Sequence, residues 1–278
     1  MTNQWQSLLE NVGEWQGSFT TFSPQGREVN DIQTTTILQG INDDQTMRQT
    51  VRRFPKNQPV EEKVLEYSTL SRGILFFTNG AFSFGSMQLA PHADLGAEVG
   101  LIDGDRRLRL VQLFNRNSEL EKITLIREKL PTSKANYPKN KRLTIEELIG
   151  TWEGEAETIF ADWSEPKKNP TQLQISYSGE KQITQELRFG SSTNPQSIKS
   201  HGEIDGNLIK FTQGSQNTQI VLLPDGASSN CPQQLKFAVP TFWEVGWLIN
   251  PNKRQRLIRT YNGKGEWKSL TLVTEHKA

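Results

Sequence analysis

An internal repeat constrains the fold of this chain more than any other feature of its sequence. Gly13-Glu14-Trp15-Gln16-Gly17 recurs as Gly150-Thr151-Trp152-Glu153-Gly154, 137 residues later. Residues 109–128 match residues 256–275 with an offset of 147 and seven identities in twenty positions. Chance matches would not keep the same order across a whole half of a chain. We therefore predict an internal duplication, with two copies of one module in tandem.

The length and the segment between the copies suggest the domain boundaries. A chain of 278 residues can form two ordinary domains, each large enough to bury a core without disulfides or metals. Residues 131–142 contain two prolines, polar and basic residues, and no hydrophobic period, which is typical of a solvated linker. We expect a first domain at residues 1–130, a linker at 131–142 and a second domain at 143–278.

Each copy begins with a short helical pattern and continues as short strand-like segments. Residues 74–77, 108–114 and 123–126 are rich in β-branched, aromatic and leucine side chains, and turn residues such as Asn79-Gly80 separate them. About eight to ten short strands per copy at this spacing predict a closed antiparallel barrel or a sandwich. No longer helical period is visible, which argues against an α/β fold. The predicted fold class is therefore all-β.

One hairpin can be placed in register in both copies. A two-residue loop pairs Gly100 with Arg109 in the first copy, and a three-residue loop pairs Gly246 with Arg256 in the second. Because side chains alternate along a strand, the glutamate two residues before each glycine shares a face with the arginine. The resulting diagonal pairs are Glu98 with Arg109, and Glu244 with Arg256.

The direction in which these pairs face decides what they could do. Facing inward, they could bind a propionate or a ring nitrogen of a ligand inside the barrel. Facing outward, they would be surface ion pairs worth about 0–1 kcal/mol. The opposite face of the same hairpins is apolar and looks like the core side, so we expect the pairs to lie outside. Glu128 and Glu275, at the ends of the last strands, are expected to be rim charges. The apolar face carries Val99, Leu101, Leu108, Leu110, Val245, Trp247, Ile249 and Leu257.

The tryptophans divide into two groups. Trp15 and Trp152 belong to the repeated motif, and we expect both to be structural plugs. Phe242, Trp243 and Trp247 give the second copy an aromatic wall that the first copy lacks. This wall could stack on a ligand, or it could belong to the core or to a contact between barrels. If a ligand binds, the wall favours the second barrel.

Composition excludes several classes of partner. The 32 basic and 31 acidic residues nearly balance, so no overall field attracts nucleic acid. No apolar run approaches the roughly 20 residues that span a bilayer, and the N-terminus lacks a signal pattern, so we expect no membrane insertion. A single cysteine, Cys231 in a loop-like context, fits a reducing compartment. We expect a soluble cytoplasmic protein.

The sequence contains little that could hold a metal or perform catalysis. His92, His201 and His276 are far apart and show no ligand spacing, so a metal site is not expected and haem ligation is disfavoured. No basic or histidine neighbour activates Cys231 as a nucleophile. No nucleophile elbow, phosphate loop or dinucleotide fingerprint is present.

The motif around Trp15 and its copy resembles the opening signature of lipocalins and other calycins, a Gly-x-Trp just after a short helix. In those families the tryptophan closes one end of the barrel, often against a late basic residue. That resemblance implies this role for Arg127 in the first copy, whereas Thr274 stands at the matching position of the second. Each copy would then be a lipocalin-like (calycin) antiparallel β-barrel opened by a short helix.

The whole chain resembles a family of cyanobacterial two-domain calycin-like proteins of unassigned function, on residues 11–19, 81–88 and 100–110. More distantly it resembles bilin lyases of the lipocalin fold, which hold an open-chain tetrapyrrole and deliver it to a phycobiliprotein. Residues 148–155 also resemble the first strand of nitrobindin-type haem barrels.

Three functions follow from the sequence and these resemblances as alternatives. The first is non-catalytic binding of a small hydrophobic or tetrapyrrole ligand, such as a bilin, inside a barrel. The second is a bilin lyase or chromophore chaperone with a phycobiliprotein as partner. The third is a structural or interaction protein whose barrels are filled by side chains.

Overall fold

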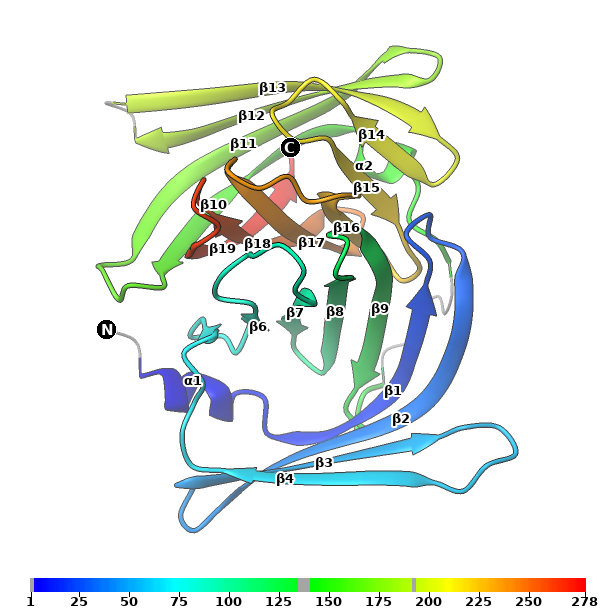
Figure 1. Cartoon of the computed structure of the whole chain (residues 1–278), viewed down its shortest axis with the longest axis vertical. Coiled ribbons are helices and arrows are strands. Elements are labelled where there is room, and N and C mark those ends of the chain that lie inside the picture. The colour runs from blue at the N-terminus through cyan, green and yellow to red at the C-terminus, as the bar shows by residue number, and fades with distance from the viewer. Residues whose placement is uncertain (1–2, 135–140, 192–193) are drawn as a thin grey trace.

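The computed structural model describes residues 3–134, 141–191 and 194–278. The described residues form two short helices and strands, which confirms the all-β prediction (Figure 1). The first half contains α1 (Gln4–Leu9), β1 (Gly13–Phe22), β2 (Glu28–Ile41), β3 (Thr46–Phe54), β4 (Glu61–Tyr67), β5 (Ile74–Phe76), β6 (Phe82–Gly85), β7 (Leu95–Asp103), β8 (Arg106–Phe114) and β9 (Leu120–Lys129). The second half contains α2 (Ile145–Leu148), β10 (Gly150–Phe160), β11 (Lys167–Gly179), β12 (Gln182–Ser191), β13 (Asn194–Asp205), β14 (Leu208–Phe211), β15 (Thr218–Leu222), β16 (Ala227–Pro232), β17 (Thr241–Asn250), β18 (Lys253–Tyr261) and β19 (Trp267–Lys277).

The two halves form barrel-like antiparallel sheets that differ in closure. In the second half, β10 pairs with both β11 and β19, and the barrel closes. In the first half the strand order is β4-β3-β2-β1-β9-β8-β7-β6-β5, so the sheet is a half-barrel with β4 and β5 at its edges. The expectation of a closed barrel is therefore correct for the second copy and wrong for the first. The three-residue β5 offers few backbone groups with which β4 could close the sheet.

The helix α1 spans the gap between the two edge strands. The Gln4 side chain donates to the Phe76 carbonyl (3.0 Å) and accepts from the Phe76 amide (2.7 Å), so it satisfies the edge of β5 as a neighbouring strand would. The Trp5 ring meets the Tyr67 ring of β4 edge-on, with centroids 6.3 Å apart. The N-terminal segment thus covers the side of the half-barrel that the sheet leaves open.

The predicted hairpin register is present in both halves. Gly100 lies opposite Arg109 in the β7–β8 pair, and Gly246 lies opposite Arg256 in the β17–β18 pair. The offset between the copies is absorbed at the turn, where β17 and β18 show an irregularity before Asn250. The sequence comparison therefore placed these strands correctly relative to each other.

The core lies in three places, and two of them are barrel interiors. Near α1, the inside of the half-barrel holds a cluster that includes Trp15, Met47 and Phe76. Near α2, the inside of the closed barrel holds a cluster around Trp152 and Ile183. The largest cluster belongs to neither interior. It forms where the outer face of β7–β9 packs on the outer face of β15–β19, and it contains the whole apolar face described above.

This third cluster corrects the expectation about the hairpin faces. The apolar side of β7–β8 and β17–β18 is the contact between the two halves, not the barrel interior. The Glu/Arg side is consequently the inward one, because successive side chains point to opposite faces of a sheet. Both faces of these strands are buried, which is why an apolar pattern alone pointed to the wrong side.

A buried arginine fastens the two halves together. Arg259 of β18 donates from Nη2 to the carbonyls of Ser86 (3.0 Å) and Gly85 (3.3 Å) in the first half. Its guanidinium lies 3.6 Å from the centre of the Trp267 ring, and its Nε donates to the Tyr261 hydroxyl (2.8 Å). Burial lowers the pKa of Arg259, and the carbonyl and ring contacts compensate in part for the lost hydration.

The strands of the first half end at Lys129, and α2 begins the second half at Ile145. Residues 135–140 of the expected linker lie outside the described residues. Within the described part of the chain, no helix has the length and apolar character needed to cross a membrane.

Candidate functional site

Four charged side chains meet on the concave face of the half-barrel. Glu128 of β9 accepts from Arg107 Nε (2.8 Å), and from Arg109 Nε (2.9 Å) and Nη2 (2.8 Å), both arginines lying on β8. Arg109 Nη1 donates to Glu98 of β7 (2.7 Å). The Glu128 side chain is fully buried, whereas that of Glu98 is 26% exposed. Glu98 is therefore the member of this cluster that solvent reaches.

Burial and ion pairing shift the pKa values of this cluster in opposite directions. Burial alone would raise the pKa of Glu128, but the two adjacent guanidiniums overcome it and hold that pKa at about 2. Glu128 and Glu98 likewise raise the pKa of Arg109 although burial opposes this. Glu128 and Arg109 are thus charged at neutral pH. Glu128 is no rim charge, and neither is the fully buried Glu275, so that expectation is wrong for both.

The second glycine of the repeated motif lies opposite the buried glutamate in each half. Gly17 of β1 lies opposite Glu128, and a Cβ at Gly17 would collide with the carbonyl oxygen of Arg127. The same holds for Gly154, opposite Glu275, where a Cβ would collide with the Thr274 carbonyl. The second glycine of each Gly-x-Trp-x-Gly motif therefore allows a close approach of the first and last strands.

The closed barrel repeats the cluster. Arg256 donates to Glu275 from Nε (3.0 Å) and Nη2 (3.1 Å), and from Nη1 to Glu244 (3.3 Å). Arg254 lies beside them, with Nη1 3.4 Å from Glu275 Oε1. The pairs Glu98/Arg109 and Glu244/Arg256 are therefore brought together as diagonal neighbours, but inside the sheets rather than outside.

Sequence reasoning missed Arg107 and Arg254. Both lie two residues before the paired arginines Arg109 and Arg256, at the repeat offset of 147. Extending the repeat by two residues would have shown an arginine in both copies on the same strand face as the pair. This signal was available, because residues two apart on a strand share a face.

The basic residue over Trp15 is Arg107, not Arg127. The Arg107 guanidinium lies 4.5 Å from the centre of the Trp15 ring. Arg127 occupies the outer face instead, where it donates to Thr20 (2.6 Å) and, across the halves, to Asp225 (2.8 Å). Arg127 falls one strand position from Glu128 and so faces the other way. In the second half, Lys277 lies over Trp152, with Nζ 5.2 Å from the ring centre.

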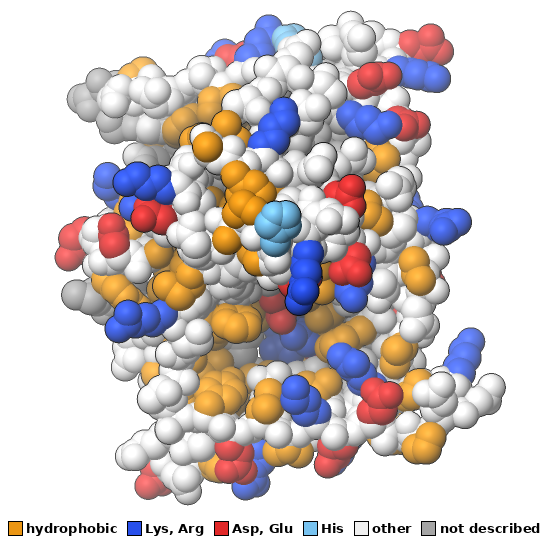
Figure 2. Space-filling model, viewed as in Figure 1, with side chains coloured by type: hydrophobic (Ala, Val, Ile, Leu, Met, Phe, Trp, Pro, Cys, Tyr) orange, Lys and Arg blue, Asp and Glu red, His pale blue; other side chains and the backbone are white. Residues whose placement is uncertain are grey.

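Apolar side chains line the concave face beyond the ion pairs. Phe84 of β6 pairs directly opposite Glu98, and its side chain is 48% exposed. Leu65 of β4 and Phe19 of β1 also face inward by register. Figure 2 shows a hollow over this part of the first half, with acidic and basic side chains at its floor. In Figure 1, β6–β8 lie on one side of this part of the molecule, and α1 and β1–β4 lie on the other.

The predicted aromatic wall does not line one surface. Trp243 and Trp247 face the contact between the halves, where Trp243 stacks on Phe114 with centroids 5.0 Å apart. Arg106 of the first half lies over Trp247, 4.9 Å from the ring centre. Phe242, one residue from Trp243, faces the barrel interior by register. The wall therefore gives no preference for the second barrel as a binding site.

The single cysteine lies away from this cluster and is buried. Cys231 is in β16 rather than in a loop, and burial raises the pKa of its thiol to about 12. Among the described residues, no three His, Cys, Asp or Glu side chains gather as metal ligands would.

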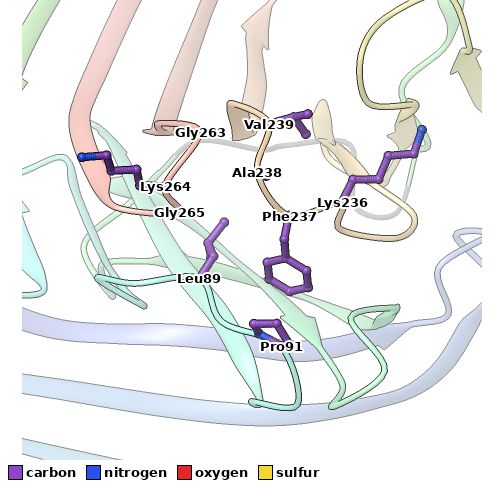
Figure 3. Close-up of a pocket in the computed structure, with 9 residues that line it drawn as sticks. All are labelled: Leu89, Pro91, Lys236, Phe237, Ala238, Val239, Gly263, Lys264 and Gly265. Atoms are coloured by element: carbon purple, nitrogen blue, oxygen red, sulfur yellow. The ribbon is translucent and has the colours of Figure 1, made fainter.

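A pocket of about 270 Å³ opens where loops of the two halves meet (Figure 3). Leu89, Phe237 and Pro91 line it, while the Lys236 and Lys264 side chains point away from it.

Family models match both halves of the chain. Residues 1–133 match the N-terminal model of DUF3598, a domain of unknown function. Residues 139–278 match the model for the C-terminal domain of Biogenesis factor required for ATP synthase 1. The comparison with curated proteins found no match.

Solved structures include one similar to the whole chain. It is the crystal structure of a DUF3598-family protein of unknown function from Nostoc punctiforme, with 41% identity, coverage of 100% of both chains and a TM-score of 0.91. The S-type phycobiliprotein lyase CPES from Guillardia theta is 12% identical, over 48% of this chain and 89% of that chain, with a TM-score of 0.41. A likeness at that level carries no argument about function.

Proposed function

The chain belongs to the DUF3598 family, and on that premise we propose that it binds a small, largely apolar ligand in the concave interior of its sheets, without catalysis. The observation that carries the proposal is the buried Arg–Glu cluster at the floor of an apolar concave face, present in both halves. A bilin or another tetrapyrrole fits this combination of apolar body and polar ring atoms.

The cluster supports binding better than it supports stability. Moving a charged side chain from water into the protein interior costs several kcal/mol per ion. Well-packed apolar residues in the same place would often stabilise the fold as much as the ion pairs do. A rigid polar floor instead orients a ligand without reorganising when the ligand arrives. Each Arg109 nitrogen already donates to a carboxylate, so the group left for a ligand is the partly exposed Glu98. A carboxylate accepts hydrogen bonds, so we propose a ligand that carries N–H or O–H groups, as tetrapyrrole rings do.

Replacing Phe84 by alanine tests the concave face. We expect Phe84→Ala to weaken binding of biliverdin about 5- to 30-fold, because it removes roughly 1–2 kcal/mol of apolar contact. Quenching of tryptophan fluorescence during titration gives the dissociation constant. Phe54→Ala is the matched control, since Phe54 is 42% exposed but faces the outside of β3.

The titration has two informative failures. Equal weakening by Phe84→Ala and Phe54→Ala would mean that the ligand does not bind in the hollow. No quenching by biliverdin, haemin or a fatty acid would remove the proposal and leave the structural role with filled barrels.

If the ligand is a bilin, the proposal extends to a phycobiliprotein as partner. Co-expression of the protein with a phycobiliprotein apo-subunit and a bilin source should then produce a coloured subunit. The colour should be lost in Phe84→Ala and kept in Phe54→Ala. A subunit that colours equally well without this protein would rule out chromophore delivery.

A cytoplasmic location stays a prediction.

A second candidate is a role in protein assembly, favoured by the family match over residues 139–278. That model describes the C-terminal domain of a biogenesis factor required for ATP synthase, so ATP synthase subunits are the partners to test. Affinity purification of the tagged full chain should then recover those subunits. Recovery that is equal with an unrelated tagged β-barrel protein would eliminate this candidate.

A further inference from the structure

The two charged floors differ in how one cation is satisfied. In the first half, Arg107 donates to Glu128 from Nε (2.8 Å) and to Asn11 Oδ1 from Nη1 (3.3 Å), while its buried Nη2 has no hydrogen-bond partner among the described residues. In the second half, the equivalent Arg254 lies 3.4 Å from Glu275, and its buried Nη1 has no hydrogen-bond partner among the described residues. The Arg254 side chain is only 4% exposed, so bulk solvent does not reach it.

Two differences between the copies explain the unsatisfied cation. Leu148 takes the place that Asn11 has in the first half. The Leu148 carbonyl accepts from the Trp152 indole (2.8 Å), as the Asn11 carbonyl accepts from the Trp15 indole (2.9 Å). The backbone role is kept, but the side-chain acceptor is lost. The cation over Trp152 is Lys277, with Nζ 5.2 Å from the ring centre, whereas the cation over Trp15 is Arg107. Arg254 therefore lacks the counterpart of the Asn11 acceptor that Arg107 has.

A lysine lies near the second floor. Lys277 is half-buried over Trp152, and its Nζ donates to the Glu147 carbonyl (3.3 Å). The buried guanidinium N–H of Arg254 that lacks an acceptor favours an anion, because a charge-assisted hydrogen bond is strong where the dielectric is low.

We propose that the closed barrel binds the carboxylate of an amphipathic ligand on Arg254. The apolar body lies along Ile258, Phe242 and Phe160, which face inward from β18, β17 and β10 and are partly exposed. This inference rests on the proposed function and adds the barrel, the anchor and the charge of the ligand. Arg107 donates to the Asn11 side chain and Arg254 has no such acceptor, so we place the anion in the second half.

Acid and ester forms of one ligand test the anchor. The full chain is titrated with cis-parinaric acid and its methyl ester, and with biliverdin and its dimethyl ester. We expect at least one acid to bind about 10-fold or more tightly than its ester, the gain of a hydrogen bond to a charged group. A preference within the parinaric pair identifies an aliphatic acid, and one within the biliverdin pair identifies a propionate.

Arg254→Gln should abolish this preference and leave ester binding unchanged. Arg188→Gln is the control, because Arg188 lies on the exposed outer face of β12. Circular dichroism checks that each variant is folded. If Arg254→Gln does not fold, Arg254→Lys replaces it, and we expect a reduced preference because a single ammonium replaces the guanidinium fork.

The outcomes separate this inference from the function on which it rests. Equal binding of acid and ester to the wild-type protein would overturn the carboxylate anchor and leave ligand binding intact. Loss of the preference in Arg107→Gln but not in Arg254→Gln would place the anchor in the first half and also overturn the inference. Failure of all four compounds to bind would overturn both proposals.

Discussion

Replacing Glu128 by glutamine should lower the free energy of unfolding by about 3–5 kcal/mol at neutral pH. The substitution removes the negative charge that compensates Arg107 and Arg109, both buried on the concave face. The amide can accept fewer hydrogen bonds than the carboxylate, and its NH₂ group would point at cationic donors. Urea denaturation followed by tryptophan fluorescence measures the loss.

The effect of Glu128→Gln should depend on pH with a defined sign. Because the two guanidiniums lower the Glu128 pKa from its ordinary value of 4.5 to about 2, the carboxylate stabilises the folded protein fully above pH 4.5. This contribution, about 3 kcal/mol from the size of the shift, is lost as the pH falls from 4.5 toward 2. The difference between wild type and variant should therefore shrink over that interval.

An exposed ion pair provides the control for Glu128→Gln. Glu62 bonds Arg52 at 2.6 Å on the outer face of the first sheet, where both side chains are about half exposed. Glu62→Gln should cost no more than about 1 kcal/mol. A loss below 1 kcal/mol for Glu128→Gln, or a loss that persists unchanged at pH 2, would show that the cluster does not hold Glu128 as a buried anion.

Trp243→Ala should cost about 3–5 kcal/mol, the range for removing a large buried aromatic side chain. Trp243 is fully buried between the halves, stacked on Phe114 and next to Tyr261, with ring centroids 5.0 Å apart in both pairs. The cavity would open in the largest core cluster, which both halves share. Thermal and urea denaturation would measure the loss, and an early transition for one half would indicate weakened docking.

Trp163 is the matched control for this substitution. It lies between β10 and β11, is 50% exposed, and lies outside the buried core clusters, so Trp163→Ala should change stability by no more than about 0.5 kcal/mol. If Trp243→Ala instead kept its stability and abolished ligand binding, Trp243 would be a ligand-stacking residue. Its position in the contact between the halves predicts the opposite result.

The repeat predicted much of the organisation because it compares one segment with another inside the same chain. The family resemblance is confirmed by the DUF3598 match and by the Nostoc punctiforme structure. The pairing of Gly100 with Arg109 and of Gly246 with Arg256 is also confirmed. These features depend on local turn lengths and on alternation along a strand, which the sequence carries directly.

The direction of the hairpin faces could not be predicted in this way. Val99 and Leu108 are buried against the other half, while Arg109 on the opposite face is buried inside the sheet. Alternation assigns residues to two faces, but it does not say which face meets a neighbouring domain. The usual rule that the apolar face is the interior fails when a second domain covers the outside.

The sequence by itself therefore determined the all-β class, the duplication, the hairpin register and the residues that share a face, because each depends on spacing along the chain. Only the tertiary structure decided that the first sheet stays open while the second closes, and that Arg107 rather than Arg127 covers Trp15. It also decided that Glu98 and Arg109 face inward, with Glu128 buried beneath them. These depend on sheet curvature and on the packing of one half against the other, which bring together residues that no spacing rule connects.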